Sequence, residues 1–122
     1  MYKIFEIENY DTLKSAVDEL CGFLLAENIP ETRVFDSKLV AYELLGNVLK
    51  HSGGSASLHG RITERGIELK IVAERVFIPP TQGKCAELFS EHGRGLFLVD
   101  SVCSERLFTE DGGILVYITT KE

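Results

Sequence analysis

Two neighbouring segments in the first half of this chain carry apolar residues at helical spacing, and few folds satisfy both. The first is predicted to begin at a cap, Asp11 or Thr12, and to end at Asn28-Ile29-Pro30. Its apolar positions are Leu13, Ala16, Val17, Leu20, Cys21, Leu24 and Leu25. The second is predicted to begin between Pro30 and Ser37, to run to about His51 and to stop at Ser52-Gly53-Gly54. Two such helices need a common apolar surface to cover.

Strand-like segments surround the two helices and supply that surface. Residues 2–8 alternate in polarity, with Lys3, Phe5 and Ile7 on one side. Further strands are predicted at 55–63 and 67–74 around a turn, and at 106–109 and 114–120 across Asp111-Gly112-Gly113. Residues 75–91 are predicted to form a loop, and 93–104 a third helix. We therefore expect an α+β fold in one domain, residues 1–122: a two-layer α/β sandwich with a mixed, mostly antiparallel sheet and three helices on one face.

Composition narrows the classes of partner and compartment. The net charge is −6 and no run of Lys or Arg occurs, so nucleic acid is not expected as a direct partner. The three cysteines, Cys21, Cys85 and Cys103, form no CxxC pair, which favours reduced thiols over a disulfide framework or a zinc site. Neither a signal peptide nor a membrane-spanning stretch is recognisable. We expect a cytoplasmic protein without membrane contact.

The second predicted helix carries a polar stripe. Glu43, Asn47 and His51 recur every four residues and so fall on one side, flanked by Gly46 and Lys50. One interpretation is a solvated polar face. The other is a chemical site, with the Glu43 carboxylate as a general base and the Asn47 amide oxygen as a ligand of magnesium bound to phosphates.

A second segment suits phosphate binding. Gly93-Arg94-Gly95-Leu96 opens the third predicted helix, where glycine allows close approach to the backbone and the helix N-terminus attracts anions. A tight turn with a cap is the alternative explanation. The segment is neither a Rossmann fingerprint nor a Walker A loop.

Together the two segments resemble the GHKL (histidine-kinase-like) ATPase superfamily, over about residues 35–120. Glu43-x-x-x-Asn47 with Lys50-His51 is similar to its N-box, and Gly93-x-Gly95-Leu96 to its second glycine box. Within the superfamily the chain is closest to the anti-sigma-factor serine kinases. The resemblance implies a Bergerat-type ATP-binding fold, with Asn47 holding magnesium through ATP, Glu43 as base, and Gly93, Arg94 and Gly95 around the phosphates. It also implies a sigma factor or an anti-anti-sigma protein as partner, and a homodimer.

The part of the site that would hold adenine departs from the family pattern. The family's Asp of the first glycine box falls on Ala73, one of its glycines falls on Phe77, and the Thr that usually begins the last strand is Ile114. Two functions therefore stay open. One is an ATP- and magnesium-dependent serine/threonine protein kinase. The other is a partner-binding regulatory module that has kept the fold and lost strong ATP binding and kinase activity.

Overall fold

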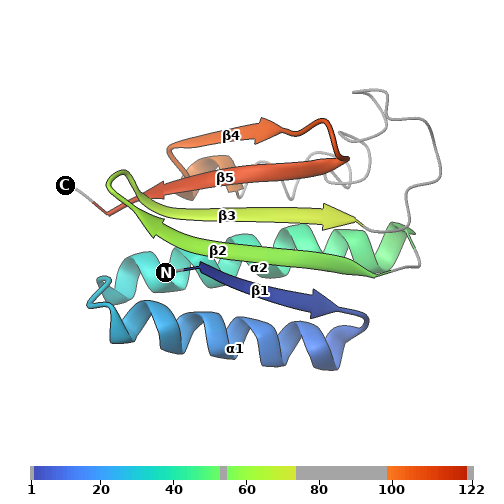
Figure 1. The fold of residues 1–122 in the computed structure, drawn as a ribbon, viewed down its shortest axis with the longest axis horizontal. Helices are drawn as coiled ribbons and strands as arrows, with labels where there is room; N and C mark the ends of the chain where they lie inside the picture. The colour runs from blue at the N-terminus through green and yellow to red at the C-terminus, as the bar shows by residue number, and fades with distance from the viewer. Residues whose placement is uncertain (1, 53–54, 74–98, 121–122) are drawn as a thin grey trace.

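The computed structural model describes residues 2–52, 55–73 and 99–120. These residues form a strand, two long helices and four further strands, in the predicted order (Figure 1). The elements are β1 (Tyr2–Ile7), α1 (Tyr10–Ala26), α2 (Glu31–Ser52), β2 (Ala56–Thr63), β3 (Gly66–Ala73), β4 (Glu105–Phe108) and β5 (Gly113–Thr119). Residues 99–102 are also helical and fall within the third predicted helix, whose earlier part lies outside the described residues.

The five strands form one sheet in the order β1-β2-β3-β5-β4. All four neighbouring pairs are antiparallel, so the prediction of a mixed sheet is wrong for the described strands. The reason lies in the connection between β1 and β2. α1 runs back against the direction of β1, α2 runs in the direction of β1, and the chain reverses once more before β2, so β2 lies antiparallel to β1 (Figure 1). The α+β class and the sandwich of sheet and helices are confirmed.

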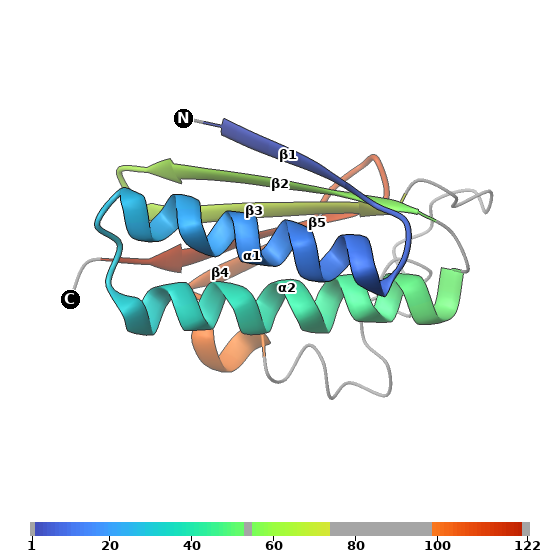
Figure 2. The ribbon, with the colours of Figure 1, turned by 90° about the horizontal axis from the view of Figure 1, so that it is seen from below.

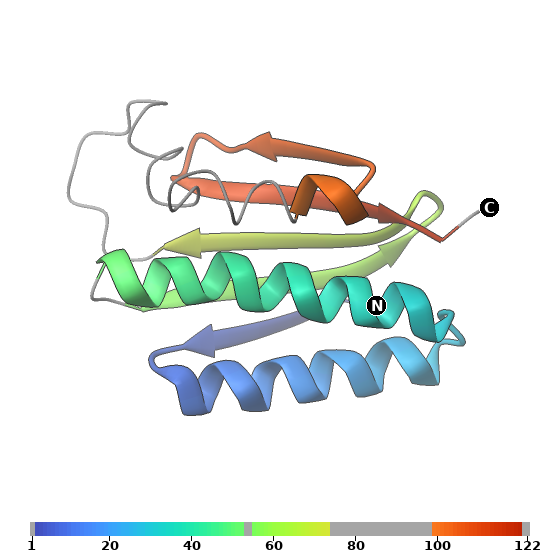
Figure 3. The same cartoon turned by 180° about the vertical axis from the view of Figure 1, so that it is seen from behind.

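The helices cover one face of the sheet. α1 and α2 lie side by side beneath it, and the short helical segment at 99–102 lies on the same face (Figures 2 and 3). The inward positions of the strands, among them Leu58, Leu69, Ile71 and Val116, are fully buried against Leu20, Leu44 and other helix residues. No helix in the described ranges is long and apolar enough to cross a membrane.

The start of α1 differs from the prediction. Asn9 is the N-cap: its side chain accepts a hydrogen bond from the backbone N–H of Thr12 at 2.9 Å. The Thr12 hydroxyl in turn accepts from the backbone N–H of Asn9 at 3.0 Å, which completes a reciprocal capping box. Asp11, one of the two predicted caps, lies inside the first turn, where its charge favours the helix N-terminus. After α1, Asn28 turns the chain with a φ of 63°.

The outer face of the sheet carries polar side chains that pair across strands. The Arg61 guanidinium forms a bidentate ion pair with the Glu68 carboxylate on the neighbouring strand. Near β1, the Tyr2 hydroxyl lies 2.5 Å from Nδ1 of His59, whose Nε2 lies 3.1 Å from the Ser57 hydroxyl. Burial and nearby Lys70 lower the pKa of His59. This face therefore consists of satisfied polar pairs with a few exposed apolar side chains between them.

Candidate functional site

The predicted stripe on α2 is only partly exposed to solvent. Lys50 is exposed and Glu43 is half-buried, whereas Asn47 is only 3% exposed. The interpretation of Asn47 as part of a solvated polar face is therefore wrong. Asn47 lies about 60° around the helix from Leu44, which is fully buried, and so borders the buried face of α2. A buried carboxamide must be hydrogen-bonded, and no buried side-chain N or O atom of the described residues lacks a partner.

The second half of α2 lies at the end of the sheet where the chain also places the other candidate residues. α2 ends at Ser52, a few residues before β2 begins at Ala56. Ala56 is paired with Ala73, the last residue of β3, and Val72 is paired with Gly113, the first residue of β5. The C-terminus of α2 and these three strand ends therefore lie together (Figures 1 and 3). This end of the sandwich is the candidate site.

Two residues predicted to lie near adenine belong to this end. Ala73 and Ile114 are on neighbouring strands, point toward the helices and are 5% and 0% exposed. Neither side chain can donate or accept a hydrogen bond, so neither can recognise the amine of a base. The first residue of β5 also leaves little space, since a Cβ at Gly113 would come within 2.7 Å of the carbonyl oxygen of Ile71. The strand side of the site is apolar and closely packed.

The helix side contains a position with open space. Gly46 precedes Asn47 and lies on the ridge that joins Glu43 to Lys50, at spacings of three and four residues. Outside the backbone of its own helix and its chain neighbours, a Cβ placed on Gly46 would have no heavy atom of the described residues within 4 Å. Glycine inside a helix is destabilising relative to alanine by roughly 0.5–1 kcal/mol. No packing contact of the described residues explains its presence.

Several predicted site residues cannot be placed relative to these. Phe77, Gly93, Arg94, Gly95 and Leu96 lie outside the described residues, as does the side chain of His51 in the last turn of α2. The predicted approach of Asn47 to the glycine pair therefore stays a prediction. The described ranges contain no group of three or more His, Cys, Asp or Glu side chains that could hold a metal ion.

Sequence reasoning did not single out a polar cluster at the same end of the sheet. The Lys70 ammonium donates to the Asp111 carboxylate at 2.8 Å, and the Thr109 hydroxyl donates to the same carboxylate. The Lys70 hydrogen bond, with help from Thr109, lowers the pKa of Asp111. The Thr109 hydroxyl also accepts from the backbone N–H of Gly113 at 3.0 Å. Lys70 and Asp111 are 41 residues apart, and no local pattern links them.

The chain was also compared with known proteins. No family model and no curated protein matches it.

Proposed function

We propose that this chain is a bacterial regulatory domain of the anti-sigma-factor serine kinase type, which binds ATP with magnesium at the α2 end of the sheet and acts on a protein partner. The observation that carries the proposal is the buried Asn47, one helical turn from Glu43, together with the open position at Gly46, the preceding residue of the same helix. A buried amide next to unfilled space suits a ligand that approaches the helix closely.

Glu43 and Asn47, one helical turn apart on α2, have the chemistry that the phosphate half of the ligand needs. The amide oxygen of Asn47 is a suitable neutral ligand for magnesium, whose remaining ligands would be phosphate oxygens and waters. The Glu43 carboxylate is one helical turn away and half-buried, where it can accept a proton from an attacking hydroxyl. The magnesium would neutralise phosphate charge, while Asn47 fixes its position and Glu43 prepares the nucleophile.

The base half of the site supports a second candidate, a partner-binding module without strong ATP binding. Ala73 and Ile114 are buried and apolar, so they offer no hydrogen bond to adenine. Losing a hydrogen bond that involves a charged group costs about 1.5–3 kcal/mol, which is roughly a ten- to hundredfold loss of affinity. The proposed kinase therefore holds its nucleotide mainly by the phosphates, and the alternative module does not hold it at all.

Thermal unfolding with and without magnesium-ATP separates the two candidates. A ligand present at about ten times its dissociation constant stabilises the folded state by about 1.4 kcal/mol. For a chain of 122 residues this corresponds to a rise of about 5 °C in Tm. The proposal predicts such a rise for the native chain and its loss in Asn47→Ala.

Asn47→Ala also removes a buried polar group, so a matched control is needed. Ser37 lies on the same helix, is fully buried, and donates its hydroxyl to the carbonyl oxygen of Arg33 at 2.9 Å. Ser37→Ala should lower the Tm of the free chain but keep the rise caused by magnesium-ATP. If millimolar magnesium-ATP leaves the native Tm unchanged, the kinase proposal fails and the partner-binding module takes its place.

Transfer of phosphate to a protein tests the kinase step separately from binding. With radiolabelled ATP and candidate sigma factors and anti-anti-sigma proteins, the native chain should label a serine of one partner. Glu43→Gln keeps the shape of the side chain and removes its basicity, so it should retain the Tm rise and lose the labelling. If Glu43→Gln labels the partner at the native rate, Glu43 is not the general base of the transfer.

A further inference from the structure

The first strand is an edge of the sheet at which the described part of the chain adds no further strand. Among residues 2–52, 55–73 and 99–120, β1 pairs with β2 alone. Two large side chains on the outer face of β1, those of Tyr2 and Ile4, are 50% and 56% exposed. An extended segment of another protein can add as a strand at such an edge and cover side chains of this kind.

The alternation of the ladder decides which backbone groups of β1 are open. In an antiparallel pair of strands, directly opposite residues alternate between a hydrogen-bonded and a non-hydrogen-bonded pair. The hairpin of β2 and β3 closes with a two-residue turn at Thr63 and Gly66, so Thr63 bonds to β3. By alternation Leu58 bonds to β1, where its partner is Phe5. Ile4 is one residue away and therefore presents its N–H and C=O to the open edge.

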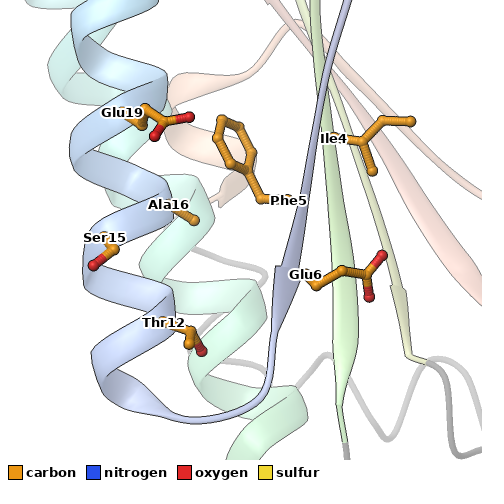
Figure 4. A pocket seen from close by; sticks show the side chains of 7 residues that line it. All are labelled: Ile4, Phe5, Glu6, Thr12, Ser15, Ala16 and Glu19. Atoms are coloured by element: carbon orange, nitrogen blue, oxygen red, sulfur yellow. The ribbon is translucent and has the colours of Figure 1, made fainter.

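A pocket of about 300 Å³ lies along the same edge, between β1 and α1 (Figure 4). Its strand side is formed by three consecutive residues, Ile4, Phe5 and Glu6, so the pocket follows the strand. Its helix side is one stripe of α1, whose members recur at spacings of three and four residues: Thr12, Ser15, Ala16 and Glu19. A strand added at this edge would place every second side chain over the pocket.

The side chains of the pocket suit a cation. The Glu19 carboxylate points toward the ring of Phe5 (Figure 4), and Glu19 forms no ion pair within the described residues. The lining includes a second carboxylate, that of Glu6, and no basic side chain. The basic residue of β1, Lys3, instead lies with its ammonium 5.8 Å from the ring of Phe23, one helical turn beyond Glu19. An ammonium or guanidinium group in the pocket would be attracted by both the ring and the carboxylate.

We propose that the edge of β1 binds an extended segment of a partner protein in which basic and apolar residues alternate. The segment pairs with the open backbone groups of Ile4. Its side chains on the helix side lie over the pocket, where a Lys or Arg pairs with Glu19 beside the ring of Phe5. Its side chains on the outer face lie beside Tyr2 and Ile4, where apolar residues remove exposed surface from water. This binding needs no nucleotide and does not rest on the function proposed above.

A labelled octapeptide of alternating Lys and Val is the probe. Fluorescence anisotropy without nucleotide, with the chain from about 1 µM to 1 mM, covers weak to moderate association. The same peptide with Glu in place of Lys should bind at least about tenfold more weakly, because it brings like charges together. A Lys-Val peptide methylated on every backbone nitrogen keeps its charge but cannot donate to the edge, and it should also bind at least about tenfold more weakly.

Variants of α1 test the pocket. Glu19→Gln should weaken binding of the Lys-Val peptide about threefold to fivefold, because it removes the charge but not the shape of the side chain. The matched control is Asp18→Asn, since Asp18 is an exposed neighbour that does not line the pocket. This variant should change the affinity by less than about twofold at physiological ionic strength. Equal losses in the two variants would mean general attraction to an acidic surface and would overturn the assignment of the pocket.

Variants of β1 test the strand pairing. Ile4→Pro removes the outward N–H without removing a bond to β2, so it should weaken peptide binding about tenfold or more. Ile4→Val keeps the N–H and should keep the affinity. If Ile4→Pro does not fold, the methylated peptide still tests the same edge from the side of the ligand.

Amide hydrogen exchange of the native chain places the bound peptide. The peptide should slow exchange at Ile4, whereas Phe5, already bonded to β2, should change little. No binding at 1 mM, or binding that leaves exchange at Ile4 unchanged, overturns the proposal. An Ile4 amide that is already protected in a dimer of the free chain, as measured by sedimentation equilibrium, also overturns it, because a second copy then occupies the edge.

Discussion

Gly46 offers a direct test of the proposed ATP site on α2. Its substitution should raise the stability of the free chain and lower its affinity for magnesium-ATP. The residue lies in the interior of α2, and beyond that helix's backbone an added Cβ would meet no heavy atom within 4 Å among residues 2–52, 55–73 and 99–120. Gly46→Ala should therefore stabilise the free chain by about 0.5–1 kcal/mol, because alanine loses less backbone entropy in a helix. With an unfolding entropy near 2.1 cal/mol/K per residue, this is a rise of about 2–4 °C in Tm.

The added methyl group lies in the space that we assign to the ligand. Overpacking of a filled site costs about 1–3 kcal/mol, so the dissociation constant for magnesium-ATP should rise about 5- to 150-fold. Isothermal titration calorimetry measures this constant, and urea unfolding of the free chain measures stability. The expected result is a more stable protein that binds its nucleotide less tightly.

Gly22 provides the matched control. It lies exposed inside α1, and beyond the backbone of that helix a Cβ there would likewise meet no heavy atom within 4 Å in the part of the chain that the structure describes. Gly22→Ala should give a similar gain in stability and leave nucleotide affinity unchanged. If Gly46→Ala lowers stability, the space is already filled by the protein. If it raises stability but leaves the affinity of a binding-competent chain unchanged, the ligand does not lie against this helix ridge.

Three further outcomes are expected. Gly113→Ala should destabilise the chain by about 1–3 kcal/mol in urea unfolding, because its Cβ would meet backbone, whereas Gly112→Ala, with open space but a φ of 82°, should cost about 1–2 kcal/mol. Because the pKa of His59 is lowered, the folded chain binds fewer protons at His59 than the unfolded chain does. The contribution of neutral His59 to the free energy of unfolding is therefore complete above about pH 6.5 and is lost as the pH falls through the folded pKa. NMR titration should show that pKa below the ordinary histidine value, and His59→Gln should flatten this part of the pH profile. Burial raises the pKa of Cys21 and Cys103, so iodoacetamide at neutral pH should alkylate both more slowly in the folded chain than in urea; equal rates would contradict the assigned burial.

Most of the fold follows from the sequence because its patterns are strong and local. The alternation in residues 2–8 and the helical spacing of Leu13, Val17 and Leu20 correspond to β1 and α1. The cap of α1 was missed because Asn9, Asp11 and Thr12 all have side chains suited to capping, and the choice depends on which pair forms the reciprocal hydrogen bonds. The order of the last two strands depends on burial. β5 lies inside the sheet, where Ile114 and Val116 are fully buried, and β4, with Arg106, takes the edge.

The candidate site was predicted less completely, because burial depends on the width of the contact between two layers. Counting residues along α2 groups Asn47 with Glu43, but Asn47 is buried and Glu43 only partly so. Burial makes Asn47 a fixed group, which suits a ligand that must be held at one place. The opposite side of the site, at Ala73 and Ile114, is equally fixed but has no polar side chain. If a nucleotide binds here, its affinity must therefore come from the phosphate side, and triphosphates with different bases should compete with ATP on nearly equal terms.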